Sequence, residues 1–283
     1  MEIKKIGVVG CGIMGAGITQ VCAQSGYNVI VSEVNEELLG KGLVSISNTL
    51  TKKVNKGKMS QQHMDAMLGR IKGTTNIGDF SDCDLVIETV VENLEIKKKV
   101  FAELDRICPE RTILASNTSS MCIIEIAAAT ERLDKVLGLH FFNPAPVMKL
   151  LEIVKTIATS DETLRIGKEF GESLGKTTVI AKDTPGFIVN RLLTPFTLNA
   201  IRVLEAGIAS RDDIDNAIKL GLNHPMGPLE LADMIGLDVI YHSANARYEE
   251  LKEYQYAPPP LLKRMVNAGW LGRKTGKGFY EYR

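Results

Sequence analysis

A histidine stands where a predicted buried strand gives way to a rigid loop. The sequence LGLHFFNPAP begins at residue 137, so an apolar run reaches His140, continues through two phenylalanines and stops at Asn143 and two prolines. An unperturbed imidazole titrates at about pH 6.5 and can therefore donate or accept a proton close to neutrality. The alternative is a core histidine that is satisfied by a backbone carbonyl. Taken alone, the segment favours this plainer role.

A glycine-rich loop near the N-terminus is the second feature that can do chemistry. The sequence GCGIMG begins at Gly10, directly after an apolar strand pattern and at the start of a helical pattern. In such a G-x-G-x-x-G loop Gly10 permits the tight turn and Gly12 lets the backbone approach a pyrophosphate. Gly15 lets the helix pack closely on the strand. The first helical turn, with Ile13 and Met14, directs its N–H groups at the negative charge. We expect these five residues to bind a dinucleotide.

An acidic residue, Glu33, ends the second strand pattern, YNVIVSEVN. A carboxylate at this point can accept hydrogen bonds from the adenosine ribose hydroxyls and repels a 2′-phosphate. Val34 and Asn35 follow it, so no arginine is placed to bind a phosphate. The alternative is an ordinary strand–helix–strand unit with an exposed acid. The context favours NAD over NADP as the cofactor.

The elements that must position these residues alternate between strand and helix. Strand patterns cover residues 6–9, 29–32, 85–89, 112–115, 136–139, 151–154 and 178–180, and helical patterns cover 14–24, 38–55, 94–107 and 162–174. This alternation predicts an α/β fold with a Rossmann-type, doubly wound, mostly parallel sheet that is covered by helices on both faces.

The interval between the second and third strand patterns is longer than one crossover helix requires. It predicts an inserted helical hairpin over about residues 36–72, interrupted at NKGKMS. An insertion of this size within a compact domain is often functional.

Strand patterns cease after the sequence AKDTPGFIVN. Five helical patterns follow, at residues 187–205, 211–220, 229–235, 239–254 and 261–268. We therefore predict a dinucleotide-binding domain over residues 1–184 and an all-helical C-terminal domain over residues 185–283.

Composition excludes several classes of partner. The 283 residues contain 34 Lys and Arg and 34 Asp and Glu, so bulk charge does not favour a nucleic-acid or membrane partner. No apolar run approaches the length that spans a membrane, and MEIKKIGVVGCG leads into a strand without a signal-peptide pattern. The five cysteines form no C-x-x-C pair and the histidines have no metal-ligand spacing. We expect a metal-free protein in the reducing cytoplasm.

Seven segments in one order carry a resemblance to a known family. They are VGCGIMGAGI, VIETVVENLEIKKKVFAELD, ASNTSS, GLHFFNPAPVMKLLEIV, DTPGFIVNRLL, HPMGPLELAD and GRKTGKGFYEY. Together they resemble the short-chain (S)-3-hydroxyacyl-CoA dehydrogenases, and most closely the stand-alone bacterial 3-hydroxybutyryl-CoA dehydrogenases. The resemblance implies NAD-dependent interconversion of acetoacetyl-CoA and (S)-3-hydroxybutanoyl-CoA.

The resemblance also implies a catalytic set. His140 would be the general acid/base, oriented by Glu152 on the next strand pattern, and Ser119 and Asn190 would bind the substrate oxygen. Each has a plainer alternative. Glu152 would be an odd charge in an apolar strand, where a charge usually has a partner. Ser119 would cap the helix that begins near MCIIEIAA, and Asn190 would be a polar residue facing water early in a helix.

Further residues are implied to lie near the nicotinamide half of the cofactor. They are Glu92, Lys97, Asn117, Ser119, Asn143 and, from the C-terminal segment, Lys274. Without the resemblance, Lys97 and Lys274 would be solvated surface charges, and Asn143 would be a turn residue before a proline.

In the resembled family the helical hairpin covers coenzyme A. Near its turn the hairpin of this chain carries Lys52, Lys53, Lys56 and Lys58, of which Lys53 and Lys56 are expected to bind the 3′-phosphate. The alternative is a solvated basic helix face. The catalytic cleft is expected between the two domains, and the helical domain is expected to form a homodimer or a dimer of dimers. Two other functions stay open: a dehydrogenase of a free hydroxy acid or sugar acid, and a non-catalytic NAD-binding protein.

Overall fold

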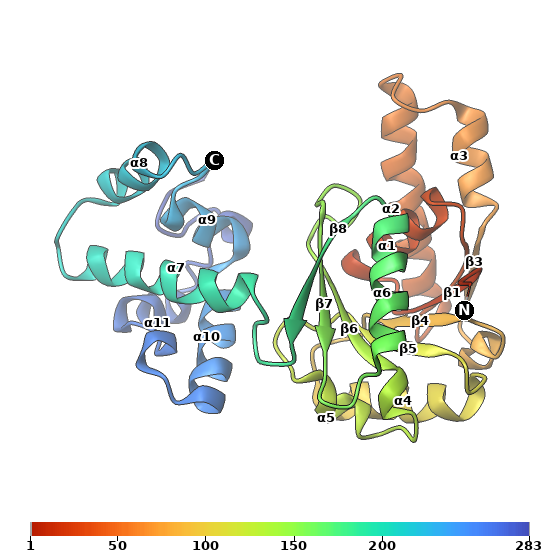
Figure 1. Ribbon diagram of the computed structural model, residues 1–283. Coiled ribbons are helices and arrows are strands. Elements are labelled where there is room, and N and C mark those ends of the chain that lie inside the picture. The colour runs from red at the N-terminus through yellow and green to blue at the C-terminus, as the bar shows by residue number, and fades with distance from the viewer. Residues whose placement is uncertain (1, 283) are drawn as a thin grey trace. The chain divides into compact units, whose positions relative to one another are not determined.

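The computed structural model describes residues 2–282 and divides into two compact units, Met1–Thr184 and Pro185–Arg283 (Figure 1). The division falls within the sequence DTPGF, where the last strand of the first unit has ended. No helix within residues 2–282 is long and apolar enough to cross a membrane. Cys11, Cys22, Cys83 and Cys108 are buried free thiols.

The first unit is built on one eight-stranded sheet in the order β3-β2-β1-β4-β5-β6-β7-β8. The strands are β1 Lys5–Val9, β2 Asn28–Ser32, β3 Ile71–Thr74, β4 Leu85–Glu88, β5 Ile113–Ser116, β6 Val136–Phe141, β7 Leu150–Lys155 and β8 Thr177–Lys182. Every neighbouring pair is parallel except β6 and β7, which are antiparallel. The predicted Rossmann-type, mostly parallel sheet is confirmed.

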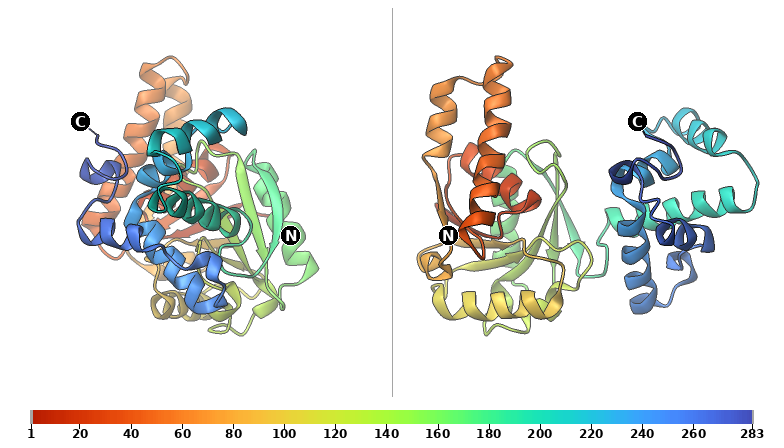
Figure 2. Two further views of the ribbon diagram at one scale, coloured as in Figure 1. Left: turned by 90° about the vertical axis from the view of Figure 1, so that its left-hand side faces the viewer. Right: turned by 180° about the vertical axis from the view of Figure 1, so that it is seen from behind.

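Helices cover both faces of this sheet. They are α1 Ile13–Gln24, α2 Glu36–Asn55, α3 Gln61–Leu68, α4 Leu94–Ile107, α5 Ile123–Ala127 and α6 Asp161–Ser173, with short 3₁₀ turns η1 Ile77–Phe80 and η2 Leu133–Lys135. Residues of α1, α2, α3 and α6 share one hydrophobic core with alternate residues of the strands. α4 and α5 lie on the opposite face of the sheet (Figures 1 and 2). Central strands covered on both faces are apolar throughout, which is why their patterns were recognisable.

The predicted helical hairpin is present, but it ends earlier than expected. α2 begins after Asn35, whose side chain accepts a hydrogen bond from the N–H of Leu38, and α3 begins after Ser60, which caps the N–H of His63. The chain after α3 forms β3, which pairs with β2 at the edge of the sheet. This strand was not predicted, because its sequence IKGT shows no alternation of apolar and polar residues.

The second unit is all-helical, as predicted. Its helices are α7 Val189–Glu205, α8 Arg211–Gly221, α9 Pro228–Ile235, α10 Leu237–Leu251 and α11 Pro260–Asn267, with 3₁₀ turns η3 Tyr254–Tyr256 and η4 Arg273–Thr275. A buried carboxylate fixes the C-terminal segment. Asp233 accepts hydrogen bonds from the N–H groups of Phe279 and Tyr280 and from the hydroxyl of Tyr282. The C-terminal turn with Lys274 is therefore part of the unit's packed structure.

Candidate active site

The glycine loop joins β1 to α1 in the geometry that a pyrophosphate requires. Gly10 has φ +97°, a conformation that L side chains rarely adopt. A Cβ at Gly15 would lie 1.9 Å from the Gly10 carbonyl oxygen, whereas a Cβ at Gly12 would have no atom within 4 Å. No side chain caps the first turn of α1, so the N–H groups around Ile13 and Met14 are not occupied by a cap. The loop fits a dinucleotide phosphate at a helix N-terminus.

Glu33 is held against this loop. Its Oε1 accepts a hydrogen bond of 2.8 Å from the N–H of Cys11, and its Oε2 accepts one of 3.1 Å from the N–H of Val34. Burial, and then the charge of Glu33, raise the pKa of the Cys11 thiol to about 11, so the thiol is protonated at neutral pH. Each carboxylate oxygen of Glu33 has a further lone pair with which to accept a ribose hydroxyl.

A buried ion-pair cluster lies at the carboxyl end of β4. Lys97 has no exposed surface, and its Nζ lies 2.7 Å from Oε1 of Glu88 and 3.2 Å from Oε2 of Glu92. Glu88 is equally buried, and its Oε2 accepts a hydrogen bond from Ser116 at the end of β5. The interpretation of Lys97 as a solvated helix charge is wrong, because two carboxylates compensate its burial.

Glu92 connects this cluster to the loop that follows β5. Its Oε1 accepts hydrogen bonds from the N–H of Ser119 and from the hydroxyls of Thr118 and Ser120. Burial alone would raise the pKa of Glu92, but the charge of Lys97 and the two hydroxyl donors lower it below its ordinary value. An ionised Glu92 therefore fixes the loop that carries Ser119.

His140 and Glu152 face one another across the antiparallel pair β6–β7. They are direct partners in the register, and Nδ1 of the imidazole lies 2.6 Å from Oε2 of the carboxylate. His140 is 5% exposed and Glu152 is fully buried. The ring of Phe142 packs on the imidazole, with ring centroids 4.5 Å apart. The Nδ1 partner is thus a carboxylate and not the backbone carbonyl of the plainer interpretation. The strand also continues to Phe141, beyond its predicted end, because β7 pairs with it there.

The loop after β5 is fixed beside this strand by Asn117. Its Oδ1 accepts a hydrogen bond of 2.9 Å from the N–H of Phe141, the residue after His140. Ser119 lies in the same loop and does not cap the following helix. The first amides of α5, at Ile123 and Ile124, donate instead to the carboxylate of Asp183, each at 2.7 Å. The capping alternative for Ser119 is therefore wrong.

The other predicted site residues are dispersed. Asn143 is exposed after the end of β6 and lines a pocket of about 210 Å³ together with the half-buried Lys53. Lys56 is exposed at the C-cap of α2. Asn190 and Lys274 belong to the second unit. Asn190 is the second residue of α7, and Lys274 forms an ion pair of 2.6 Å with Asp238.

Several residues of the site were missed by the sequence interpretation. They are Glu88, Ser116, Thr118 and Asp183. Glu88 could have been found from the sequence, because it is an acid at the end of an apolar strand pattern. Glu33 and Glu152, which were found, are likewise acids that follow or interrupt such a pattern. Asp183 had no such signal, because its partners are backbone amides distant in sequence.

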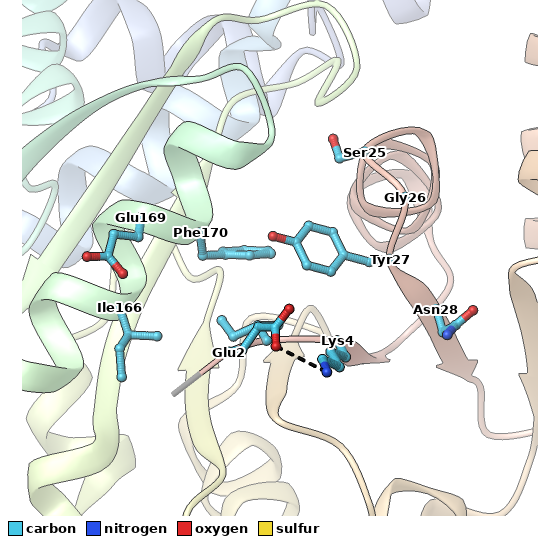
Figure 3. A pocket seen from close by; sticks show the side chains of 10 residues that line it. Glu2, Lys4, Ser25, Gly26, Tyr27, Asn28, Ile166, Glu169 and Phe170 are labelled. Carbon is cyan, nitrogen blue, oxygen red and sulfur yellow. Dashed lines mark ion pairs between the residues drawn. The ribbon is translucent and has the colours of Figure 1, made fainter.

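A larger hollow of about 580 Å³ lies at the amino ends of the strands, opposite to the carboxyl ends that carry the residues above (Figure 3). It is lined by residues at the amino ends of β1 and β2, with the rings of Tyr27 and Phe170 5.7 Å apart and an ion pair between Glu2 and Lys4. Ligands of doubly wound folds bind at the carboxyl ends of the strands, so this hollow is not the active site.

The fold, the glycine loop and the acid held against it define a nicotinamide-dependent dehydrogenase. Two family descriptions match the chain: "3-hydroxyacyl-CoA dehydrogenase, NAD binding domain" over residues 5–184, and "3-hydroxyacyl-CoA dehydrogenase, C-terminal domain" over residues 186–282. The chain belongs to the 3-hydroxyacyl-CoA dehydrogenase family. Its cofactor is NAD, as the sequence predicted.

Named relatives match over the whole length. The 3-hydroxybutyryl-CoA dehydrogenase of Mycobacterium tuberculosis is 48% identical over 282 residues, covering 99% of each chain. That of Bradyrhizobium diazoefficiens is 46% identical, covering 99% of this chain and 96% of its own. The crystal structure of (S)-3-hydroxybutyryl-CoA dehydrogenase from Ralstonia eutropha has a TM-score of 0.97 at 43% identity, covering both chains completely.

The contacts of Glu33 generate a prediction about cofactor choice. Glu33→Gln combined with Val34→Arg should reduce the preference for NADH over NADPH, in kcat/KM, by about one to two orders of magnitude. The change removes a repulsive charge and adds a charge-assisted phosphate contact. Initial rates with both cofactors measure it. Glu37→Gln, an exposed acid in the first turn of α2, is the matched control. A wild-type protein that uses NADPH better would contradict the role of Glu33.

Proposed function

We propose that this protein interconverts acetoacetyl-CoA and (S)-3-hydroxybutanoyl-CoA, with His140 as the general acid/base. The contact between His140 and Glu152 carries the proposal, because an imidazole held by a buried carboxylate is arranged for proton transfer. The names of full-length relatives support the four-carbon thioester as the substrate.

The chemistry divides between the cofactor and this chain's residues. NADH supplies a hydride to the 3-keto carbon when it is bound. His140 gives its proton to the 3-keto oxygen in reduction, and it takes that proton from the 3-hydroxyl in the reverse direction. Glu152 accepts the Nδ1–H, which leaves Nε2 as the nitrogen that exchanges the proton. The two residues therefore act as one unit.

Ser119 and Asn190 are the proposed partners of the substrate oxygen. Both side chains can donate hydrogen bonds to an oxygen on which charge changes during hydride transfer. The hydrogen bond from the N–H of Ser119 to Glu92 supports this role for Ser119, because it fixes the backbone from which the hydroxyl projects.

We further propose that Glu92, Asn117, Asn143 and Lys274 bind the nicotinamide half of NAD. Lys97 takes part through Glu92, because its ammonium is buried between two carboxylates. The ionised state of Glu92 supports its role as a hydrogen-bond acceptor.

The proposed activity is tested first by substrate class. Purified protein with NADH should reduce acetoacetyl-CoA rapidly and free acetoacetate little, as followed by NADH absorbance. Preference for the free acid would favour the alternative of a hydroxy-acid dehydrogenase. Binding of NADH without turnover of any substrate offered would indicate a non-catalytic protein.

Removing the imidazole should abolish proton transfer without weakening cofactor binding. We expect His140→Ala to lower kcat by about two to four orders of magnitude, the usual range for a lost general acid/base. The dissociation constant of NADH should stay nearly unchanged. The double mutant with Glu152→Gln should lose much less than the two single losses multiplied, because the residues act as a unit.

His63→Ala is the matched control for this prediction, because His63 is exposed on α3. It should turn over normally. A folded His140→Ala protein with near-normal turnover, or losses that simply multiply in the double mutant, would return His140 to a structural role.

We propose that Lys53 and Lys56 bind the 3′-phosphate of coenzyme A. The half-buried Lys53 lines the same pocket as Asn143, which supports its orientation toward a ligand. A plainer role also exists, because lysines in the last turn of α2 are favoured by the helix dipole.

Changing both lysines to glutamine should separate these roles. The KM for acetoacetyl-CoA should rise roughly tenfold, the loss expected for one charge-assisted contact. The 3′-dephospho substrate should be affected far less, as measured by steady-state kinetics. Lys41→Gln, in the first half of the same helix, serves as the control. Equal losses with both substrates would remove these lysines from the phosphate site.

We also propose that the second unit associates with a second copy of the chain, as a homodimer or a dimer of dimers. Its surface exposes large apolar side chains, including Leu220 at 85% and Ile208 at 73%. Light scattering should give a mass of at least twice the 31.0 kDa of the chain, and Leu220→Glu should lower it. Ile157→Glu, on an apolar residue of the first unit that is still more exposed, at 96%, should not. A monomeric wild type would refute the proposal.

We propose a reducing, cytoplasmic location for the protein. The buried free thiols of Cys11, Cys22, Cys83 and Cys108 support it.

A further inference from the structure

A fully buried arginine, Arg247, lies on α10 of the second unit. It is 1% exposed, and its Nη1 donates hydrogen bonds to the hydroxyl of Thr194 at 3.2 Å and to the backbone carbonyl and hydroxyl of Ser243. All three acceptors are neutral. Its Nε and Nη2 are buried without a hydrogen-bond partner in residues 2–282. Arginine is almost never fully buried unless it is paired, because an uncompensated buried charge is costly.

A second cation, Arg191, adds to this excess of positive charge. It is the third residue of α7, and its Nη1 is also buried without a partner in the described residues, while its Nη2 lies 3.5 Å from Oε1 of Glu253. Burial lowers the pKa of Arg247, the phenol of Tyr256 opposes this, and the charge of Arg191 lowers it further. A guanidinium nevertheless stays protonated at neutral pH. An anion would satisfy the unpaired donors of both arginines.

The unpaired edge of Arg247 has the shape that a carboxylate requires. Nε and Nη2 form one edge of the guanidinium, and their two parallel N–H groups match the two oxygens of a carboxylate. This edge faces Gly186, since a Cβ there would lie 2.5 Å from Nε and 3.0 Å from Nη2. Because Gly186 has no side chain, no atom beyond the backbone occupies this edge at that position.

The guanidinium lies close to a proposed substrate contact. Asn190 and Thr194 are four residues apart on α7, so they lie on the same face of the helix, about 6 Å apart along its axis. Thr194 contacts Arg247, and Asn190 is the proposed partner of the oxygen at C3 of the acyl group. Arg247 is therefore about one helical turn from the reacting carbon. An acyl chain that extends a few carbons beyond C3 spans such a distance.

We propose that Arg247, together with Arg191, binds a terminal carboxylate on the acyl chain, so that the protein also accepts thioesters of 3-hydroxy dicarboxylic acids. The inference rests on the proposed function and extends its substrate class. The hydride and proton transfers at C3 are unchanged, and the carboxylate stays ionised and takes no part in them. Entry of the carboxylate requires the backbone at Gly186 to move away from the guanidinium edge. Arg247 is thus a specificity-determining residue.

The test compares two substrates of equal carbon number. 3-Oxoadipyl-CoA ends in a carboxylate, and 3-oxohexanoyl-CoA ends in a methyl group. The wild type with NADH should favour the first by about ten- to hundredfold in kcat/KM, the gain expected for charge-assisted hydrogen bonds. Equal efficiency, or a preference for 3-oxohexanoyl-CoA, would overturn the proposal without any variant.

Arg247→Met removes the guanidinium and keeps a long, unbranched side chain. The variant should lose the preference for 3-oxoadipyl-CoA. Its kcat/KM for acetoacetyl-CoA and its dissociation constant for NADH should stay nearly unchanged. Its Tm should not fall, because an apolar side chain replaces a buried charge that lacks an ionic partner. A variant that keeps the full preference would refute the role of Arg247.

Arg202→Met is the matched control. Arg202 lies on α7, and its Nη1 and Nη2 already donate to Oδ1 of Asn199 and to the backbone carbonyls of Tyr254 and Ala257. It should keep the preference of the wild type, and an equal loss in this variant would contradict a specific role for Arg247.

Arg247→Lys is the second variant and decides the question if Arg247→Met does not fold. It keeps the charge but loses the two parallel donors that match a carboxylate. The preference for 3-oxoadipyl-CoA should therefore fall and not disappear. An unchanged preference would refute the paired contact with the carboxylate.

Failure of this inference is distinguishable from failure of the proposed function. A wild type that reduces no 3-oxoacyl-CoA with NADH refutes the function. A wild type that reduces acetoacetyl-CoA but does not favour 3-oxoadipyl-CoA refutes only the carboxylate site. Calorimetry with adipyl-CoA and hexanoyl-CoA, which have no keto group to reduce, provides a readout independent of turnover. The wild type should bind adipyl-CoA more tightly, and Arg247→Met should bind the two equally.

Discussion

The arrangement of the candidate site depends on a buried carboxylate, Glu88, at the end of β4. Its two oxygens accept hydrogen bonds from the hydroxyl of Ser116, the N–H of Val90 and the ammonium of Lys97. A buried charge is stable only when it is paired and hydrogen-bonded in this way. These contacts join the end of β4 to β5, to the loop that follows β4 and to α4. Lys97 extends the network to Glu92. The loop with Ser119 is therefore positioned by paired, buried charges at the carboxyl ends of the central strands.

The proton-transfer pair depends on a different constraint, the one antiparallel pairing in an otherwise parallel sheet. Antiparallel neighbours place directly opposite residues on the same face with their Cβ atoms close together. His140 and Glu152 are such a pair, and both lie within apolar strands that leave them little contact with water. The strand pairing itself thus orients the imidazole. The hydrogen bond from Phe141 to Asn117 then connects this pair to the loop that Glu92 holds.

Much of the first unit could be predicted from local patterns. The central strands are apolar runs because both faces are covered, and the glycine loop has a distinctive spacing because its backbone conformation excludes side chains. β3 could not be predicted, because a short edge strand is formed by pairing with β2 and not by its own pattern. α5 is equally short, and its first amides are satisfied by Asp183, a residue distant in sequence.

The sequence by itself determined the fold class, the family and the choice of NAD, because glycine spacing, strand–helix alternation and the acid after β2 are local signals. Only the tertiary structure decided what each buried polar group contacts. It showed that Lys97 is an internal ion-pair residue and that the first amides of α5 are capped by Asp183 and not by Ser119. The physical reason is that hydrogen-bond partners and desolvation are set by residues far apart in the chain, whose proximity exists only after the sheet and its helices have packed.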